Sequence, residues 1–304
     1  MKLKGILTIA RPNFLILAII LGILGTSIAW YEHQEFGGPF NLGYAFLATF
    51  GLIIAHAGVN IFNDYFDSRS KLDTKTQRTP FSGGSGAIQS GLITEKGALW
   101  TGIACLIIII PIGIFFTIEQ GWMLLPLLVV AILSIILYTP FILRIGYPEW
   151  SAGLGLGVLP VLGAYFVQTG TYTMGALLAS IPSGILVHNL LLLNEFPDAE
   201  YDVTVKRRTL PISIGKKNAA VFYSALNIIM YLWIIGTVIT HYMPAFTLIG
   251  LLTLPLAFKA INGSFKYDDR SKFIPAMAAN VMTVLATQAL IAAGFILAGV
   301  FNGH

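Results

Sequence analysis

Charged residues are scarce in this chain. Only 11% of its 304 residues are Asp, Glu, Lys or Arg, whereas 56% are hydrophobic. So few charges cannot cover the surface of a soluble protein of this size, which excludes a soluble enzyme, a disordered tail and a fibrous repeat. The single cysteine, Cys105, excludes an intrachain disulfide and a metal cluster held by cysteines.

Long apolar runs recur along the sequence instead. Each is about 20 residues long, enough for a helix to cross roughly 30 Å of hydrocarbon. We therefore expect an all-α integral membrane bundle. Its nine helices are predicted at residues 14–31, 41–61, 98–118, 121–143, 150–168, 174–193, 219–240, 242–258 and 273–301. Glycines and Pro160 interrupt the fifth run, and membrane helices tolerate both where they pack closely.

The basic residues are divided unequally between the two sides of this bundle. With nine helices, all 18 Lys and Arg residues lie on the side of the N-terminus. The opposite side carries only acids, namely Glu32, Glu35 and Glu119. Because Lys and Arg prefer cytoplasmic connections, we expect the N-terminus inside and the C-terminus outside, in a cytoplasmic (plasma) membrane. The same rule accounts for the net charge of +4, so this charge does not predict nucleic-acid binding.

Two of the basic connections begin with a similar acidic motif. The sequence N-D-Y-F-D at 63–67 returns as N-E-F-P-D at 194–198, and each motif follows an apolar run directly. A further acid comes after each motif, Asp73 in the first case and Asp202 in the second. Acids at a membrane helix end are often only solvated caps, but two matching clusters among 14 acids favour a shared site. We interpret the chain, 1–304, as a single membrane-embedded domain with two pseudo-repeated halves.

The spacing within the motifs predicts two stripes of oxygen ligands. Residues four apart share one face of a helix, which groups Asn63 with Asp67. The same spacing groups Asn194, Asp198 and Asp202. Carboxylate and amide oxygens without His or Cys suit Mg²⁺, which also accepts phosphate oxygens. Basic and polar residues near the motifs are predicted to bind the substrate, namely Asn60, Lys71, Arg78, Arg144, Asn194, Lys206, Arg207 and Arg208.

Metal-binding acids, basic residues and an apolar bundle together fit an allylic diphosphate. Mg²⁺ would bridge its diphosphate to the acids, and neutralising this leaving group would let the C–O bond ionise while the tail lies among the helices. The aromatic face of Tyr138 could stabilise the resulting cation. The predicted catalytic residues are Asp67, Asp198, Asp202 and Tyr138. The predicted metal ligands are Asn63, Asp64, Asp67, Asp73, Asp198 and Asp202.

Several longer motifs extend over most of the chain. They are N-D-Y-F-D-S-R-S-K-L-D-T at 63–74, R-T-P-F-S-G-G-S-G at 78–86, Y-T-P at 138–140, G-Y-P-E at 146–149, L-P-V-L-G-A-Y-F-V-Q-T-G at 159–170, N-E-F-P-D-A-E-Y-D at 194–202 and R-R-T-L at 207–210. With these motifs the chain resembles the UbiA superfamily of intramembrane aromatic prenyltransferases. The resemblance implies nine helices around a central cavity, and Mg²⁺-dependent prenyl transfer from a polyprenyl diphosphate to a small aromatic acceptor. Carried over by position, it also implies that Asn63, Asp67, Asp198 and Asp202 ligate Mg²⁺ and that Arg78 and Arg208 hold diphosphate.

Within that superfamily, Asp73 and the motif at 159–170 look more like the menaquinone branch, which prenylates 1,4-dihydroxy-2-naphthoate. Lys71 stands where that branch tends to have Gly, and Glu195-Phe196-Pro197 replaces its Asn-x-Arg. Other acceptors, as in ether-lipid or tetrapyrrole prenylation, therefore stay open. Two further alternatives are a CDP-alcohol phosphotransferase, whose acidic motif is one continuous stretch, and a secondary transporter, whose site should lie near the membrane midplane.

Other polar residues have less specific interpretations. His56 and His188 precede the two acidic motifs symmetrically, and each fits a hydrogen bond between helices, acceptor binding or proton handling. The glycine-rich run at 83–86 belongs to a connection long enough to cover the mouth of a cavity. Thr94 is expected to cap the N-terminus of the helix that leads into the third span.

Overall fold

The computed structural model describes residues 3–70 and 79–302, and nine segments of this part are long and apolar enough to cross a membrane. Six of these segments are single α-helices, and three are built from two or more consecutive helical pieces. The single helices are α2 (Pro12–Phe36), α3 (Leu42–Ser70), α4 (Glu95–Gln120), α9 (Met174–Glu195), α12 (Lys216–Ile239) and α14 (Arg270–Asn302). The prediction of an all-α bundle with nine spans is confirmed for the described residues.

The composite spans contain turns that are wider or tighter than an α-helix. The fourth span comprises η2 (Trp122–Leu124), α5 (Leu125–Leu137), η3 (Tyr138–Ile142) and α6 (Leu143–Ile145). The fifth comprises α7 (Pro148–Gly153), η4 (Leu154–Val158) and α8 (Leu159–Thr169), and the eighth comprises η6 (Ala245–Thr253) and α13 (Leu254–Ser264). The π-helical turns η3 and η4 are a type of irregularity that is often found at functional sites.

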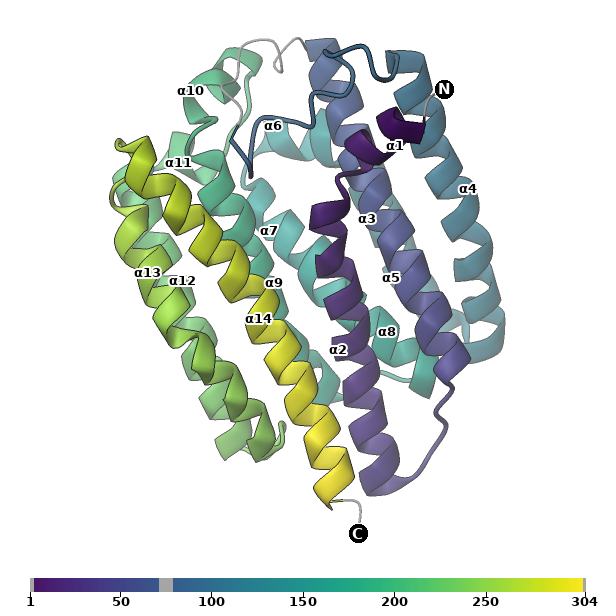
Figure 1. Cartoon of the computed structure of the whole chain (residues 1–304). Helices are drawn as coiled ribbons and strands as arrows, with labels where there is room; N and C mark the ends of the chain where they lie inside the picture. The colour runs from purple at the N-terminus through teal and green to yellow at the C-terminus, as the bar shows by residue number, and fades with distance from the viewer. Residues whose placement is uncertain (1–2, 71–78, 303–304) are drawn as a thin grey trace.

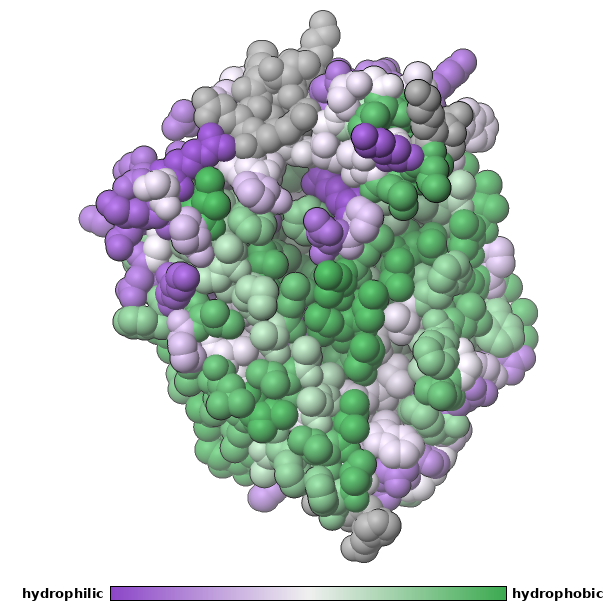
Figure 2. Space-filling view, in the orientation of Figure 1, coloured by the Kyte–Doolittle hydropathy of each residue, from purple (hydrophilic) through white to green (hydrophobic). Residues whose placement is uncertain are grey.

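The helices run lengthwise through the molecule, so that α1 (Leu3–Ala10) and the C-terminal end of α14 lie at opposite ends (Figure 1). Hydrophobic residues cover most of the face drawn in Figure 2, and hydrophilic residues gather mainly toward its two ends. Large apolar side chains such as Ile118, Trp122 and Leu252 are exposed. This distribution is the one that a bilayer requires of a multi-pass membrane protein.

The glycines of the fifth span are explained by close packing against α9. A methyl group added at Gly157 would lie 2.7 Å from the carbonyl oxygen of Ser183 and 2.8 Å from the Cα atom of Gly184. One added at Gly153 would lie 2.6 Å from the carbonyl oxygen of Gly184. The two spans therefore touch through their backbones, as membrane helices with small residues do.

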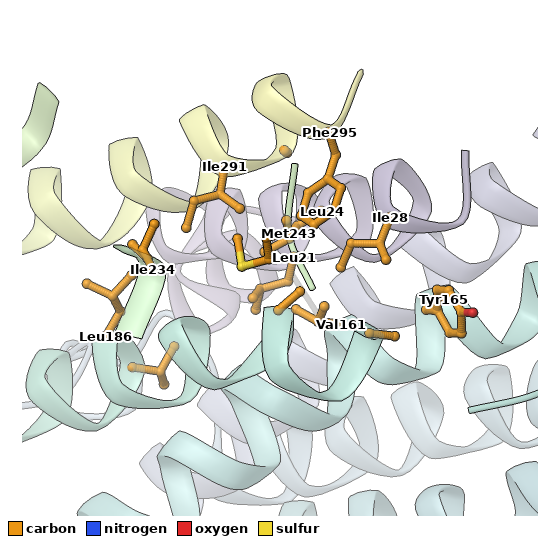
Figure 3. Packing of buried hydrophobic residues seen from close by; sticks show 14 of the residues in the cluster. Leu21, Leu24, Ile28, Val161, Tyr165, Leu186, Ile234, Met243, Ile291 and Phe295 are labelled. Carbon is orange, nitrogen blue, oxygen red and sulfur yellow. The ribbon is translucent and has the colours of Figure 1, made fainter. Parts of the chain in front are cut away.

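A hydrophobic core joins the first span to the second half of the chain. Leu21 and Leu24 of α2 pack in one cluster with Ile291 and Phe295 of α14 and with Val161 of α8 (Figure 3). These five side chains are no more than 1% exposed. This packing fixes α2 between α8 and α14, and Leu21 together with Ala18 of the same helix also lines a cavity.

The C-terminal ends of α3 and α9 lie at the same end of the bundle as α1, and we call this the motif end (Figure 1). It also carries α10 (Ala199–Asp202), η5 (Val203–Val205) and α11 (Leu210–Ser213). Thr94 accepts a hydrogen bond from the backbone N–H of Gly97 at 3.0 Å at the start of α4, which confirms the predicted cap.

Candidate active site

A cavity of about 580 Å³ lies inside the bundle and reaches the motif end. Its walls are mostly apolar and come from α2, α3, α4, α5, α8 and α9. Polar groups are concentrated where the two acidic motifs reach it. An apolar chamber with a polar mouth suits an amphipathic ligand whose charged group stays at the mouth.

The first acidic motif lies on the last turns of α3, and its residues point in different directions. Asn63 and Asp67, four residues apart, both line the cavity. Asp64 is not part of the cavity wall, because it is ion-paired with Arg11 and also accepts from the hydroxyl of Ser85. The prediction that Asp64 is a metal ligand is therefore not supported, since one helical step rotates it away from the Asn63–Asp67 face.

The second motif departs from the expected continuous stripe. Helix α9 ends at Glu195, a turn that contains Pro197 follows, and α10 begins at Ala199. Asn194, Asp198 and Asp202 nevertheless all line the cavity. The predicted convergence of these residues is thus achieved by a broken helix instead of one continuous face.

Arg207 connects the two motifs. Its guanidinium group is ion-paired with Asp67 of the first motif, and it lies 3.1 Å from Asp202 of the second. The arginine side chain is only 12% exposed and also lines the cavity. Two acidic motifs that are 131 residues apart therefore meet at one cation.

Backbone hydrogen bonds hold the segment that carries Arg207. The N–H of Arg208 donates to Leu143 at 2.9 Å, and the Arg208 carbonyl accepts from Tyr147 at 3.0 Å. The N–H of Leu210 donates to the carboxylate of the buried Glu149 at 2.5 Å. Gly146 turns between these contacts with φ of 123°, a conformation that side chains disfavour. The fourth and fifth spans thus fix the segment from 208 to 210 and aim Arg207 inward.

Among the described residues, no cation forms an ion pair with Asp198, although Arg207 pairs with its neighbours Asp67 and Asp202. Burial, together with the neighbouring charge of Asp202, raises the pKa of Asp198 to about 7. The Oδ1 atom of Asn194 is buried without a hydrogen-bond partner among the described residues. Within the described ranges, no group of three or more His, Cys, Asp or Glu side chains is close enough together to hold a metal ion without further ligands. Oxygen ligands of this kind fit Mg²⁺, which uses few carboxylates and completes its coordination with water and phosphate.

Arg11 is a cavity-lining cation that lies outside the sequence motifs. It stands between α1 and α2 in a left-handed conformation, φ 53°, directly before Pro12. Its pairing with Asp64 holds the guanidinium group at the cavity, and its Nε atom has no hydrogen-bond partner within the described chain. An arginine followed by proline at the edge of the first span was the available signal.

The remaining predicted residues divide into three groups. Tyr138 and Asn60 line the cavity, and the amide of Asn60 donates to the carbonyl of Ala10 at 3.0 Å. Exposed side chains outside the cavity wall are Arg144, Lys206 and Arg208, so their placement does not support substrate binding. The residues Lys71, Asp73 and Arg78 lie outside the described residues.

The two histidines are not equivalent. His56 lines the cavity near Arg11. His188 is fully buried outside the cavity wall, with its ring centroid 4.5 Å from that of Trp150 and its Nδ1 atom 3.2 Å from Asn189. Of the two, only His56 is placed to meet a ligand in this cavity.

The loop before α4 closes over part of the mouth. Ser82, Gly83 and Gly84 line the cavity, and the hydroxyl of Ser82 lies 3.5 Å from Asp198. This position agrees with the prediction that the glycine-rich run covers a cavity mouth.

Comparisons with known proteins give consistent results. Residues 33–284 match the model of the UbiA prenyltransferase family. A 1,4-dihydroxy-2-naphthoate octaprenyltransferase of Bacillus subtilis is 28% identical over 95% of this chain and 91% of its own length. A digeranylgeranylglyceryl phosphate synthase of Thermococcus kodakarensis is also 28% identical, over 83% of this chain and 81% of its own. A UbiA homologue of Archaeoglobus fulgidus, solved with GPP and Mg²⁺, has the same fold, with a TM-score of 0.59, 14% identity, and coverage of 94% of this chain and 99% of its own.

Proposed function

The chain belongs to the UbiA prenyltransferase family, and we propose that it transfers a polyprenyl chain from an allylic diphosphate to an aromatic acceptor inside the membrane. The observation that carries the proposal is the meeting of both acidic motifs at Arg207, at the mouth of an apolar cavity. Such a site holds the charged leaving group at the mouth and the hydrocarbon chain inside the bundle.

Mg²⁺ fits the oxygen donors of this mouth. Asn63, Asp67, Asp198 and Asp202 would hold the ion, as they all line the cavity and are hard oxygen ligands. When bound, Mg²⁺ would supply positive charge to the diphosphate. The UbiA homologue solved with GPP and Mg²⁺ supports the choice of this ion.

The side chains of the protein then have distinct tasks. Arg207 and Arg11 would hold diphosphate oxygens, for which a guanidinium group has matching geometry. The apolar walls exclude water while the C–O bond of the donor breaks. The ring of Tyr138 faces the same cavity and would stabilise the allylic cation until a ring carbon of the acceptor forms the new C–C bond and a proton leaves the ring.

For the acceptor we favour a 1,4-dihydroxy-2-naphthoate-like compound, as in the menaquinone branch. The naphthoate prenyltransferase from Bacillus subtilis supports this choice, because its similarity extends over 95% of the chain. A glyceryl phosphate acceptor is the second candidate, because the synthase from Thermococcus kodakarensis is equally identical over a shorter part. The two separated motifs and the family match disfavour a CDP-alcohol phosphotransferase, and acids at a helix end disfavour a transporter with a midplane site.

We also propose that the chain is one domain with two pseudo-repeated halves. In support, α3 and α9 each end in an acidic motif at the same end of the bundle (Figure 1). The positive-inside rule supports a cytoplasmic motif end, with the C-terminus on the other side of a plasma membrane.

Product formation by the purified protein in lipid tests the function. The protein is given octaprenyl diphosphate with either 1,4-dihydroxy-2-naphthoate or a glyceryl phosphate acceptor, with and without Mg²⁺. We expect prenylated naphthoate only with Mg²⁺. Asp67→Asn should remove this activity, and the exposed Asp268→Asn serves as the matched control. Full activity of Asp67→Asn, or product from glyceryl phosphate alone, would contradict the proposal.

A further inference from the structure

Glu195, the last residue of α9, is a buried acid that the proposed metal and diphosphate contacts do not use. It is 6% exposed and lines the cavity. Apart from the carboxyl group of Glu149, no group of the described residues forms a hydrogen bond with either carboxylate oxygen. A buried carboxyl group without a donor is costly, so a ligand that supplies one gains affinity there.

The immediate partner of Glu195 is another carboxyl group. Glu149 of α7 lies within hydrogen-bonding reach of it and is itself fully buried, so the two acids can share at most a proton and leave acceptor positions unfilled. One oxygen of Glu149 accepts from Leu210, and the other has no partner within the described residues. Arg207, the cation that acts on Glu195, is engaged by Asp67 and Asp202. The two carboxyl groups form an acidic patch, in which Glu195 lines the cavity and Glu149 is buried beside it outside the cavity wall.

The ligands of the proposed reaction differ in what they can give this patch. The prenyl chain has no hydrogen-bond donor, and the diphosphate is an anion that a carboxylate repels. A hydroxyl group on the acceptor ring is a donor of the right size. Tyr138, beside which the allylic cation would form, also interacts electrostatically with Glu195. A ring held at Glu195 thus lies close to the reacting end of the donor.

We propose that Glu195 binds a ring hydroxyl of the aromatic acceptor by accepting its hydrogen bond; this inference rests on the proposed function. It follows that the site selects hydroxylated rings. It also follows that a negatively charged substituent on the acceptor points away from the acidic patch, because two carboxyl groups would repel it.

Steady-state kinetics with two matched acceptors test this role. Naphthalene-1,4-diol, kept reduced, is compared with 4-methoxy-1-naphthol, which has one hydroxyl group fewer. In the wild type we expect the diol to have the lower KM. Glu195→Leu should raise the KM for the diol about tenfold to a hundredfold and remove the preference, while the KM for the donor stays within twofold. Glu195→Gln, which keeps one oxygen acceptor, should have an intermediate KM.

Controls separate this inference from its alternatives. The matched control is Glu200→Gln, because the side chain of Glu200 is 80% exposed and pairs with Lys216 on the surface. An unchanged KM for the diol in both Glu195 variants would overturn the inference while leaving the proposed function intact. An increase in the Mg²⁺ concentration that gives half-maximal rate, in place of the effect on KM, would identify Glu195 as a metal ligand and would also overturn the inference.

If the wild type prenylates no aromatic acceptor, the proposed function itself fails. Thermal unfolding of each variant shows whether it folds, and Glu195→Gln is the test if Glu195→Leu does not.

Discussion

Replacing Arg207 should have a larger effect on catalysis than any other change among the basic residues after the second motif. Its guanidinium group contacts Asp67 and Asp202 and lines the cavity, so it is placed to hold two diphosphate oxygens. Hydrogen bonds that involve charged groups contribute about 1.5–3 kcal/mol each. Loss of two such contacts in Arg207→Gln predicts a fall in kcat/KM of roughly 10²- to 10⁴-fold. Arg207→Lys keeps the charge but not the planar fork, and one lost contact predicts a fall of roughly tenfold to a hundredfold.

The neighbouring arginine is the matched control for this prediction. Arg208 is exposed, lies outside the cavity wall and holds its position through its backbone. Prenylation by Arg208→Gln should therefore remain within about twofold of the wild type, since exposed charges contribute little. Rates are measured in lipid at several donor concentrations, and thermal unfolding confirms that each variant is folded. Equal losses in Arg207→Gln and Arg208→Gln would refute the reasoning.

Three further changes test other parts of the site and the fold. Asp198→Asn should lower the Mg²⁺-dependent rate by at least about a hundredfold, and a near-normal rate would remove Asp198 from the metal site. Asp64→Asn should release Arg11, so that the KM for the donor rises about tenfold while the Mg²⁺ requirement is unchanged; a changed Mg²⁺ requirement would restore Asp64 as a ligand. Gly157→Ala should lower the unfolding temperature, because overpacking against α9 costs about 1–3 kcal/mol, whereas Gly236→Ala has no atom within 4 Å and should not; equal unfolding temperatures would contradict the close contact.

The spans and the location of the site were predictable from the sequence because each depends on a repeated pattern. Uncharged runs of membrane length predicted nine helices, and the duplicated acidic motif predicted one site at one end of the bundle. The four-residue spacing correctly placed Asn63 and Asp67 on the cavity face. Asp64 was predicted as a metal ligand as well, although it is one residue out of step with that face and is not part of the cavity wall.

The individual arginines were not predictable in the same way. Arg207 and Arg208 are adjacent in sequence, and which one faces the cavity depends on backbone contacts with Leu143 and Tyr147, 61 or more residues earlier. Arg11 enters the site because Asp64 holds it, which is a contact between distant parts of the chain. The spacing of residues within a motif does not predict contacts between distant parts of the chain. The positive-inside rule also places many basic residues at this end of the bundle, whether or not they bind substrate.

The carboxylate of Asp64 joins three separate parts of the chain, since it binds Arg11 ahead of α2, belongs to α3 and accepts from Ser85 in the loop over the mouth. Groups that share one partner do not contribute independently. The connection between α1 and α2, which carries Arg11, and the glycine-rich loop are consequently coupled through one carboxylate. A substrate whose anionic group drew Arg11 away from Asp64 would change how strongly Asp64 holds the loop. Entry at the mouth and capture of the leaving group would then be energetically coupled through a side chain that is not part of the cavity wall.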